Sequence, residues 1–194
     1  AERKRIIEQA LERAIDTGAL GAWFQPQVDL MTRRITGFEA LVRWQHPQLG
    51  FVSPPEIVNA ARAVHLSEQL TARIAGDACL LARRLPKLGL SDVTVALNVS
   101  PREFALYSVA SMLQRVTTAH DVDPSALEIE ITEEAILDPA LADEQLKQLE
   151  QAGYKLAVDD FGMGHSSLAY LIGLKVDRLK IDRSFVRDVA RSET

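Results

Sequence analysis

The feature that most constrains the fold of this chain is the alternation of short apolar segments with helical patterns in its second half. Residues 93–97, 127–131 and 155–158 are rich in β-forming side chains, and each is followed by a loop and a helical pattern. Residues 176–181 are a fourth segment of this kind. Strands that alternate with helices are joined by right-handed crossovers and form a parallel sheet. The pattern therefore predicts an α/β fold, and both a barrel and an open doubly wound sheet fit it.

The first half of the chain begins differently. Residues 1–20 are a predicted lead-in helix, with apolar side chains on one face, charged side chains on the other, and Gly18 as its end. Residues 23–30 and 35–44 are predicted strands, joined by a turn at 31–34.

Two helix starts carry a recognisable cap. Ser53 is followed by two prolines and Glu56, and Ser100 is followed by a proline and Glu103. A serine with a glutamate three residues later predicts a capping box. Leucines at helical spacing predict one long helix over residues 66–88.

Composition excludes several classes of function. The formal net charge of −5 argues against a binding surface for a nucleic-acid polymer. Cys79 is the only cysteine, which excludes an internal disulfide and disfavours a cysteine-based zinc site. There is no apolar run of membrane-spanning length and no signal peptide in the sequence. We expect a cytoplasmic protein, or the cytoplasmic part of a membrane-tethered one.

Polar side chains gather at the carboxyl ends of the predicted strands. In α/β barrels this rim carries the active site. Two carboxylates about 4 Å apart repel by roughly 4 kcal/mol at an effective dielectric constant of about 20, so a cluster needs shared protons or a cation. Oxygen ligands select Mg²⁺, Mn²⁺ or Ca²⁺ over zinc, and adjacent aspartates can serve two ions. The residues are Glu39, Asn98, Glu130, Glu133, Asp159, Asp160 and Lys180.

Several of these residues also have a simpler interpretation when taken alone. The pair Asp159-Asp160 fits a turn with local side-chain capping, and Lys180 fits a lysine at the edge of a strand. Glu128, two residues before Glu130, is interpreted as a structural carboxylate that faces away from the site.

With these residues in place, the sequence resembles the EAL-domain family of cyclic di-GMP phosphodiesterases. The signature Glu39-Ala40-Leu41 is present, and the likeness runs from about residue 23 to 186. The resemblance implies a TIM-like barrel with an antiparallel first strand, which we assign to residues 21–194. Four further blocks follow in family order: Asn98-Val99-Ser100, Glu130-Ile131-Thr132-Glu133, Asp159-Asp160-Phe161-Gly162 and Lys180-Ile181-Asp182.

The resemblance also implies a reaction, the hydrolysis of cyclic di-GMP to linear pGpG with two Mg²⁺ or Mn²⁺ ions. Lys180 matches the lysine near the attacking water. It forms the implied catalytic group together with Glu39 and Asp160. The second metal ion is served by Asp159 and Asp160. The implied ligands of the first ion are Glu39, Asn98, Glu130 and Asp159.

Substrate and partners follow from the same resemblance. Glu133 matches the glutamate that anchors the loop after Asp160, and through this loop the family couples metal binding to dimerisation. A homodimer and a fused sensory or GGDEF domain are therefore expected partners. For Arg43 a structural salt bridge is the alternative. The implied contacts of the dinucleotide are Gln25, Leu41, Arg43, Asn98 and Asp182.

The sequence departs from the family pattern at Met163, His165 and Lys175, where threonine, an aromatic residue and proline are usual. It also ends at Thr194, before two family strands that carry a second-metal glutamate and a glutamine near guanine. We expect these C-terminal strands to be absent, leaving open sheet edges unless another segment or chain completes the barrel. A degenerate or truncated domain that binds cyclic di-GMP without cutting it is the alternative to an enzyme, and a structural scaffold is the third possibility.

Overall fold

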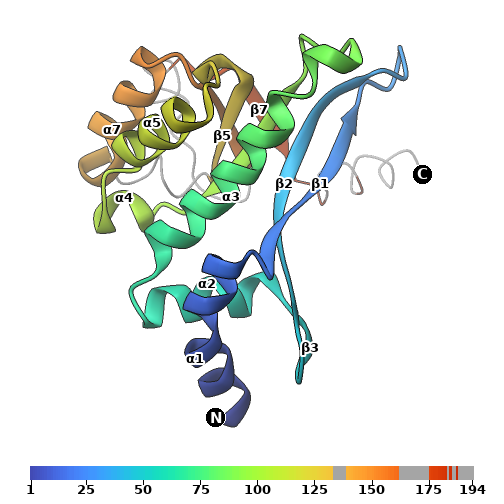
Figure 1. Ribbon diagram of the computed structural model, residues 1–194. Helices are drawn as coiled ribbons and strands as arrows, with labels where there is room; N and C mark the ends of the chain where they lie inside the picture. The colour runs from blue at the N-terminus through green and yellow to red at the C-terminus, as the bar shows by residue number, and fades with distance from the viewer. Residues whose placement is uncertain (133–138, 162–174, 183, 185–186, 188–194) are drawn as a thin grey trace.

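A single twisted sheet organises the chain, of which the computed structural model describes residues 1–132, 139–161, 175–182, 184 and 187 (Figure 1). The strand order is β1-β2-β4-β5-β6-β7, and β3 pairs with β2 outside this path. The strands are β1 Leu20–Val28, β2 Ile35–His46, β3 Gly50–Val52, β4 Thr94–Val99, β5 Leu127–Thr132, β6 Lys155–Phe161 and β7 Arg178–Ile181.

The first strand is antiparallel to β2, and the neighbours from β2 through β4, β5 and β6 to β7 are all parallel. This confirms the antiparallel first strand and the parallel sheet predicted from the sequence. The hairpin turn is held by Asp29, whose carboxylate accepts hydrogen bonds from the backbone N–H and the hydroxyl of Thr32 at 2.6 and 2.8 Å. The turn therefore lies where the sequence placed it.

Helices pack against one face of this sheet, with α3, α5 and α7 side by side (Figure 1). The segment predicted as a lead-in helix is helical, and Gly18 ends it in the left-handed conformation with φ of 73°. The helices are α1 Glu2–Thr17, α2 Pro54–Ala63, α3 Ser67–Ala82, α4 Glu103–Leu106, α5 Val109–His120 and α7 Pro139–Gln151, with short 3₁₀ turns at Pro86–Leu88 and Pro124–Ala126.

The helix boundaries confirm one predicted cap and modify two other predictions. Ser53 and Glu56 form the complete capping box of α2. At the second site only half of the box is present: the Ser100 N–H donates to the Glu103 carboxylate at 2.9 Å, and α4 begins at Glu103 itself. The long helix predicted over 66–88 ends at Ala82, because Pro86 has no N–H to continue it.

The hydrophobic core lies between the helices and the side chains that alternate along the strands. On β4, β5 and β6 these side chains are at most 1% exposed: Leu97, Ile129, Ile131, Leu156 and Val158. We call this helix-covered side the outer face and the opposite side the inner face. Ala96 and Ala157 are also buried, but they lie outside this core cluster because they occupy inner-face positions.

In the described part of the chain, no helix has the length and apolar character needed to cross a membrane.

Candidate active site

The inner face of the sheet is charged where the outer face is apolar. Side chains two residues apart on a strand share a face. Glu128 and Glu130 of β5 therefore both point inward, and both are 1% exposed. The prediction that Glu128 faces away from the site is wrong, because the strand period of two residues places it beside Glu130. Opposite them on β7, Arg178 lies 3.1 Å from Glu128, and Lys180 lies 2.7 Å from Glu130.

Lys180 is the centre of a carboxylate cluster. Its Nζ donates hydrogen bonds to Glu130 Oε2 at 2.7 Å and to Asp159 Oδ2 at 3.0 Å. Glu39 Oε2 lies 3.7 Å from the same nitrogen. Asn98 Nδ2 donates to Glu39 Oε1 at 2.9 Å and joins the cluster from β4. Five residues predicted from four strand ends and β7 therefore meet at one place.

Asp160 leaves this cluster through an unusual backbone conformation. Its φ is 54°, in the left-handed region that aspartate tolerates better than most residues. The register between β6 and β7 shifts between Val158 and Phe161, and the Asp160 N–H donates to Asp159 Oδ1 at 2.9 Å. Asp160 is exposed, so the two adjacent aspartates present their carboxylates to different surroundings.

The pKa values of the cluster reflect its burial. Burial raises the pKa of Glu130 to about 7, although the hydrogen bond from Lys180 opposes the shift. Burial lowers the pKa of Lys180, but its contacts with Glu130, Asp159 and Glu39 outweigh this effect and leave the pKa raised. The pKa of Asp160 is raised by burial and by the charges of Asp159 and Asp182.

The chemistry of the donors fits a hard divalent cation. The cluster offers carboxylate and amide oxygens, the ligands that Mg²⁺ and Mn²⁺ prefer. Three buried oxygen atoms of β5 have no hydrogen-bond partner: Glu128 Oε1, Glu130 Oε1 and Thr132 Oγ1. However, among the described residues no three His, Cys, Asp or Glu side chains are arranged as a metal-ion site. The carboxylates converge on the Lys180 ammonium, so the geometry itself does not test the metal prediction.

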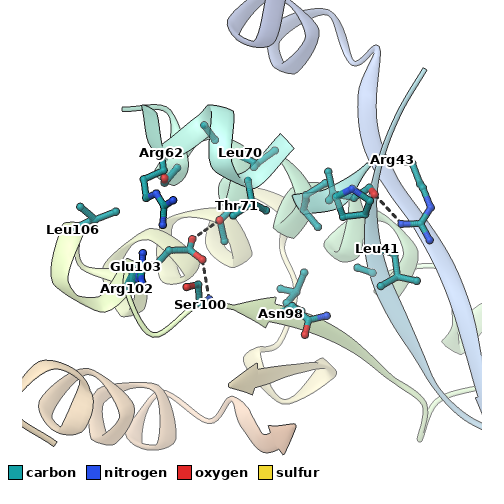
Figure 2. A pocket seen from close by; sticks show the side chains of 18 residues that line it. Leu41, Arg43, Arg62, Leu70, Thr71, Asn98, Ser100, Arg102, Glu103 and Leu106 are labelled. Atoms are coloured by element: carbon teal, nitrogen blue, oxygen red, sulfur yellow. Dashed lines mark hydrogen bonds between the residues drawn. The ribbon is translucent and has the colours of Figure 1, made fainter. Parts of the chain in front are cut away.

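Three of the predicted dinucleotide contacts lie around one pocket. Leu41, Arg43 and Asn98 line a cavity of about 260 Å³ between the sheet and helices α2, α3 and α4 (Figure 2). Arg43 lies at one side of the pocket and donates to the Val42 carbonyl at 2.9 Å, and Arg62 and Arg102 lie at the other side (Figure 2). The cavity thus combines apolar walls with cationic groups at both sides.

The two other predicted contacts lie apart from this pocket lining. Gln25 is exposed on β1 and pairs in register with Glu39, which places it next to the carboxylate cluster. Asp182 follows β7 and accepts hydrogen bonds from the backbone N–H of Ser184, at 2.8 Å, and from its hydroxyl. Glu133 and the loop over residues 162–167 lie outside the described residues, and so does the prediction that this loop mediates dimerisation.

Two polar networks were missed from the sequence. Glu103 was interpreted only as a helix cap, yet its carboxylate also accepts hydrogen bonds from Thr71, at 2.6 Å, and from Tyr107 beside the pocket. Arg178 donates to Gln27 Oε1 at 2.8 Å and faces Glu128. The signal for this second network was present in the sequence, since charges at 128 and 130 and at 178 and 180 repeat with the strand period.

A curved α/β sheet with an acidic site at the carboxyl ends of its strands defines a TIM-like barrel protein. Within that class the chain belongs to the EAL domain family, since the family's sequence model matches residues 8–194. The match begins inside α1, so it includes most of the helix that the sequence set apart as a lead-in.

Relatives with assigned activities share substantial identity with the chain. A cyclic di-GMP phosphodiesterase from Pseudomonas aeruginosa is 39% identical over 87% of this chain and 29% of its own length. The bifunctional diguanylate cyclase and cyclic di-GMP phosphodiesterase MucR from the same species is 34% identical over 98% of this chain and 28% of its own length. The chain therefore spans less than a third of the length of these curated relatives.

Solved structures agree with the sheet topology. The MucR phosphodiesterase in complex with cyclic di-GMP has a TM-score of 0.86 at 33% identity, with 95% of this chain and 75% of that chain covered. The EAL enzyme Bd1971, bound to cAMP and cyclic di-GMP, has a TM-score of 0.83 at 30% identity, with 98% and 53% covered.

Proposed function

We propose that this chain hydrolyses cyclic di-GMP to linear pGpG in a reaction that requires divalent metal ions. The observation that carries the proposal is the convergence of Glu39, Glu130 and Asp159 on Lys180, with Asn98 bonded to Glu39. Family membership and the phosphodiesterase activity of the Pseudomonas relatives support it.

In this proposal the oxygen atoms of the carboxylate cluster and of the adjacent Asp160 would hold the metal ions. Glu39, Asn98, Glu130 and Asp159 would hold one Mg²⁺ or Mn²⁺ ion, and Asp159 and Asp160 would hold a second. Bound metal lowers the pKa of water and stabilises charge on a phosphodiester. The unpartnered Glu130 Oε1 supports this assignment, because a buried carboxylate oxygen without a partner is costly.

The residues around the metal ligands bind and orient the dinucleotide. Arg43 carries a cationic group suited to a phosphate, and Leu41 lines the apolar cavity in which a base can be buried. Gln25 and Asp182 supply amide and carboxylate groups for hydrogen bonds to the ligand. Lys180 holds the attacking water and stabilises developing negative charge.

A second candidate is a receptor that binds cyclic di-GMP without cutting it. One observation favours it: the Lys180 ammonium already neutralises Glu130 and Asp159, at 2.7 and 3.0 Å. A fused sensory or GGDEF domain is a further part of the proposal, and the cyclase activity that MucR combines with its phosphodiesterase activity supports it. We also propose that the protein forms a homodimer through the loop after Asp160.

The test is turnover of cyclic di-GMP followed as pGpG by chromatography, with Mg²⁺ or Mn²⁺ and with EDTA. Glu39→Ala is expected to lower turnover by about 100-fold or more, since even the partners of metal ligands typically contribute 10–100-fold. Glu68→Gln, at an exposed ion pair with Arg115, is the control and should retain turnover within about twofold. Tight binding of cyclic di-GMP without pGpG in the presence of metal would establish the receptor instead.

A further inference from the structure

Two charged pairs connect β5 to β7 across the strand between them. Glu128 faces Arg178, and Glu130 faces Lys180, although β6 separates β5 from β7 in the sheet. Ala157 of β6 is in register with Glu130 on one side and with Arg178 on the other. Its side chain is only a methyl group, which leaves room for the pairs to meet above β6.

The pair of Glu128 and Arg178 is also held by a residue of a third strand, β1. Arg178 Nη1 donates to Gln27 Oε1 of β1 at 2.8 Å and lies 3.1 Å from Glu128 Oε1. The room for Gln27 is kept by Gly37 on β2, because a Cβ atom there would lie 2.6 Å from Gln27 Oε1. In the described part of the chain β7 pairs with β6 alone, so these side-chain contacts are its links to the strands beyond.

The buried carboxylate of Glu128 requires a positive charge close to it. The residue is 1% exposed, and a buried carboxylate without a cation is strongly unfavourable. Arg178 supplies this charge. Lys180 is the next cation on the same face of β7, two residues further along, and it is committed to Glu130 and Asp159. Without Arg178, the cations left near Glu128 are Lys155 and Lys180, and at Lys180 it would compete with Glu130 for the ammonium group.

We propose that Arg178 is a positioning residue: by neutralising Glu128, it reserves Lys180 for Glu130, Asp159 and Glu39. The consequence for turnover rests on the proposed phosphodiesterase function. Arg178 itself touches none of the carboxylates assigned to the metal ions. It affects the reaction indirectly, by fixing the position of the Lys180 side chain.

The test compares one single and one double variant by their kcat and KM values. Arg178→Met should lower kcat by about 10–100-fold, as expected for a residue that orients an active-site group, and change KM by less than about threefold. Glu128→Gln/Arg178→Met should recover kcat to within about threefold of the unchanged protein, because the competing carboxylate is gone. A purely structural role predicts the reverse, a double variant no better than the single one.

Lys155 provides a matched control. It is in register with Glu128 on the neighbouring strand β6, and so it is another cation close to the same carboxylate. Lys155→Met should leave kcat within about threefold, because Arg178 still neutralises Glu128.

A second readout is independent of turnover: the position of Lys180 Nζ in crystal structures of the variants. In Arg178→Met the nitrogen should move from Glu130 to Glu128, and in the double variant it should return to Glu130. If the unchanged protein shows no turnover, the proposed function fails and these structures still decide the inference. Arg178→Met with Lys180 still bonded to Glu130 would overturn the inference.

If the Arg178→Met variant does not fold, the charge swap Glu128→Arg/Arg178→Glu takes its place in the test. The swap keeps the pair neutral, so Lys180 should remain at Glu130 and kcat should stay within about fivefold. Displacement of Lys180 in the swapped protein, or a kcat loss as large as that of Lys180→Ala, would contradict the role assigned to Arg178.

Discussion

The two faces of the sheet are built from alternate residues of the same strands, yet they have opposite roles. On the outer face, Leu97, Ile129 and Val158 are at most 1% exposed and contact other apolar side chains. On the inner face, Glu128 and Glu130 are equally buried but carry groups that oppose burial. The outer face therefore supplies the stability with which the inner face keeps Glu128 and Glu130 out of water.

The two tryptophans give the largest expected difference between the faces. Trp44 is an outer-face residue of β2 at 2% exposure, packed edge-to-face on His46, and Trp23 is an inner-face residue of β1 at 71% exposure. Trp44→Ala should lower the free energy of unfolding by about 3–5 kcal/mol. Trp23→Ala should lower it by less than about 1 kcal/mol. Urea unfolding measures both, and equal losses would break the distinction between the faces.

The pH dependence of stability sharpens the comparison on the inner face. The pKa of Glu130 is raised from 4.5 to about 7 in the folded protein, so the folded state binds more protons than the unfolded state between these values. Stability in the absence of metal should therefore fall as the pH rises from about 4.5 to 7, by up to about 3 kcal/mol from this group. Glu130→Gln should remove this component of the decline.

Urea unfolding at a series of pH values between about 4 and 8, in EDTA, measures the slope. Ile129→Val, an outer-face change next to Glu130, is the control and should lower stability by about 1 kcal/mol at every pH. An unchanged slope in Glu130→Gln would show that another group carries the pH dependence.

The smallest expected effect concerns the start of a helix on the outer face. Ser53 caps α2, and its partner Glu56 also binds Arg3 of α1 at 2.7 Å. Ser53→Ala should lower the free energy of unfolding by about 1 kcal/mol. The helix α3 begins without a side-chain cap, so Ser67→Ala is the control and should change stability by less than about 0.5 kcal/mol. Equal losses of stability at the two serines would show that the Ser53 cap does not stabilise α2.

The fold was predictable where one local rule decides the outcome. The strand segments were found because they are rich in β-forming side chains, and α2 because Ser53 and Glu56 are spaced as a capping box. The rim position of Glu39, Asn98 and Asp159 followed from the same reasoning, since the carboxyl ends of parallel strands meet at one edge.

The remaining features depend on contacts that are distant in sequence. The end of α3 at Ala82 reflects Pro86, a breaker outweighed in the prediction by the leucine spacing around it. The spacing of the charges at 128 and 130 and at 178 and 180 shows that each pair shares one face, but it does not show which cation meets which carboxylate, because that depends on which strands become neighbours. Glu128 was assigned to the wrong face for a simpler reason. The strand period of two residues puts Glu128 and Glu130 on the same face, and the prediction placed them on opposite faces.

The contact between Gln27 and Arg178 also bears on the order in which the protein folds. It joins residues 151 positions apart, whereas the hairpin of β1 and β2 pairs residues close in sequence. Closing a long loop costs more entropy than closing a short one, and non-local contacts form slowly. We therefore expect the hairpin to form early and the far end of β7 to dock late. The chain would then complete its helix-covered core first and acquire its chemistry only in the last step of folding.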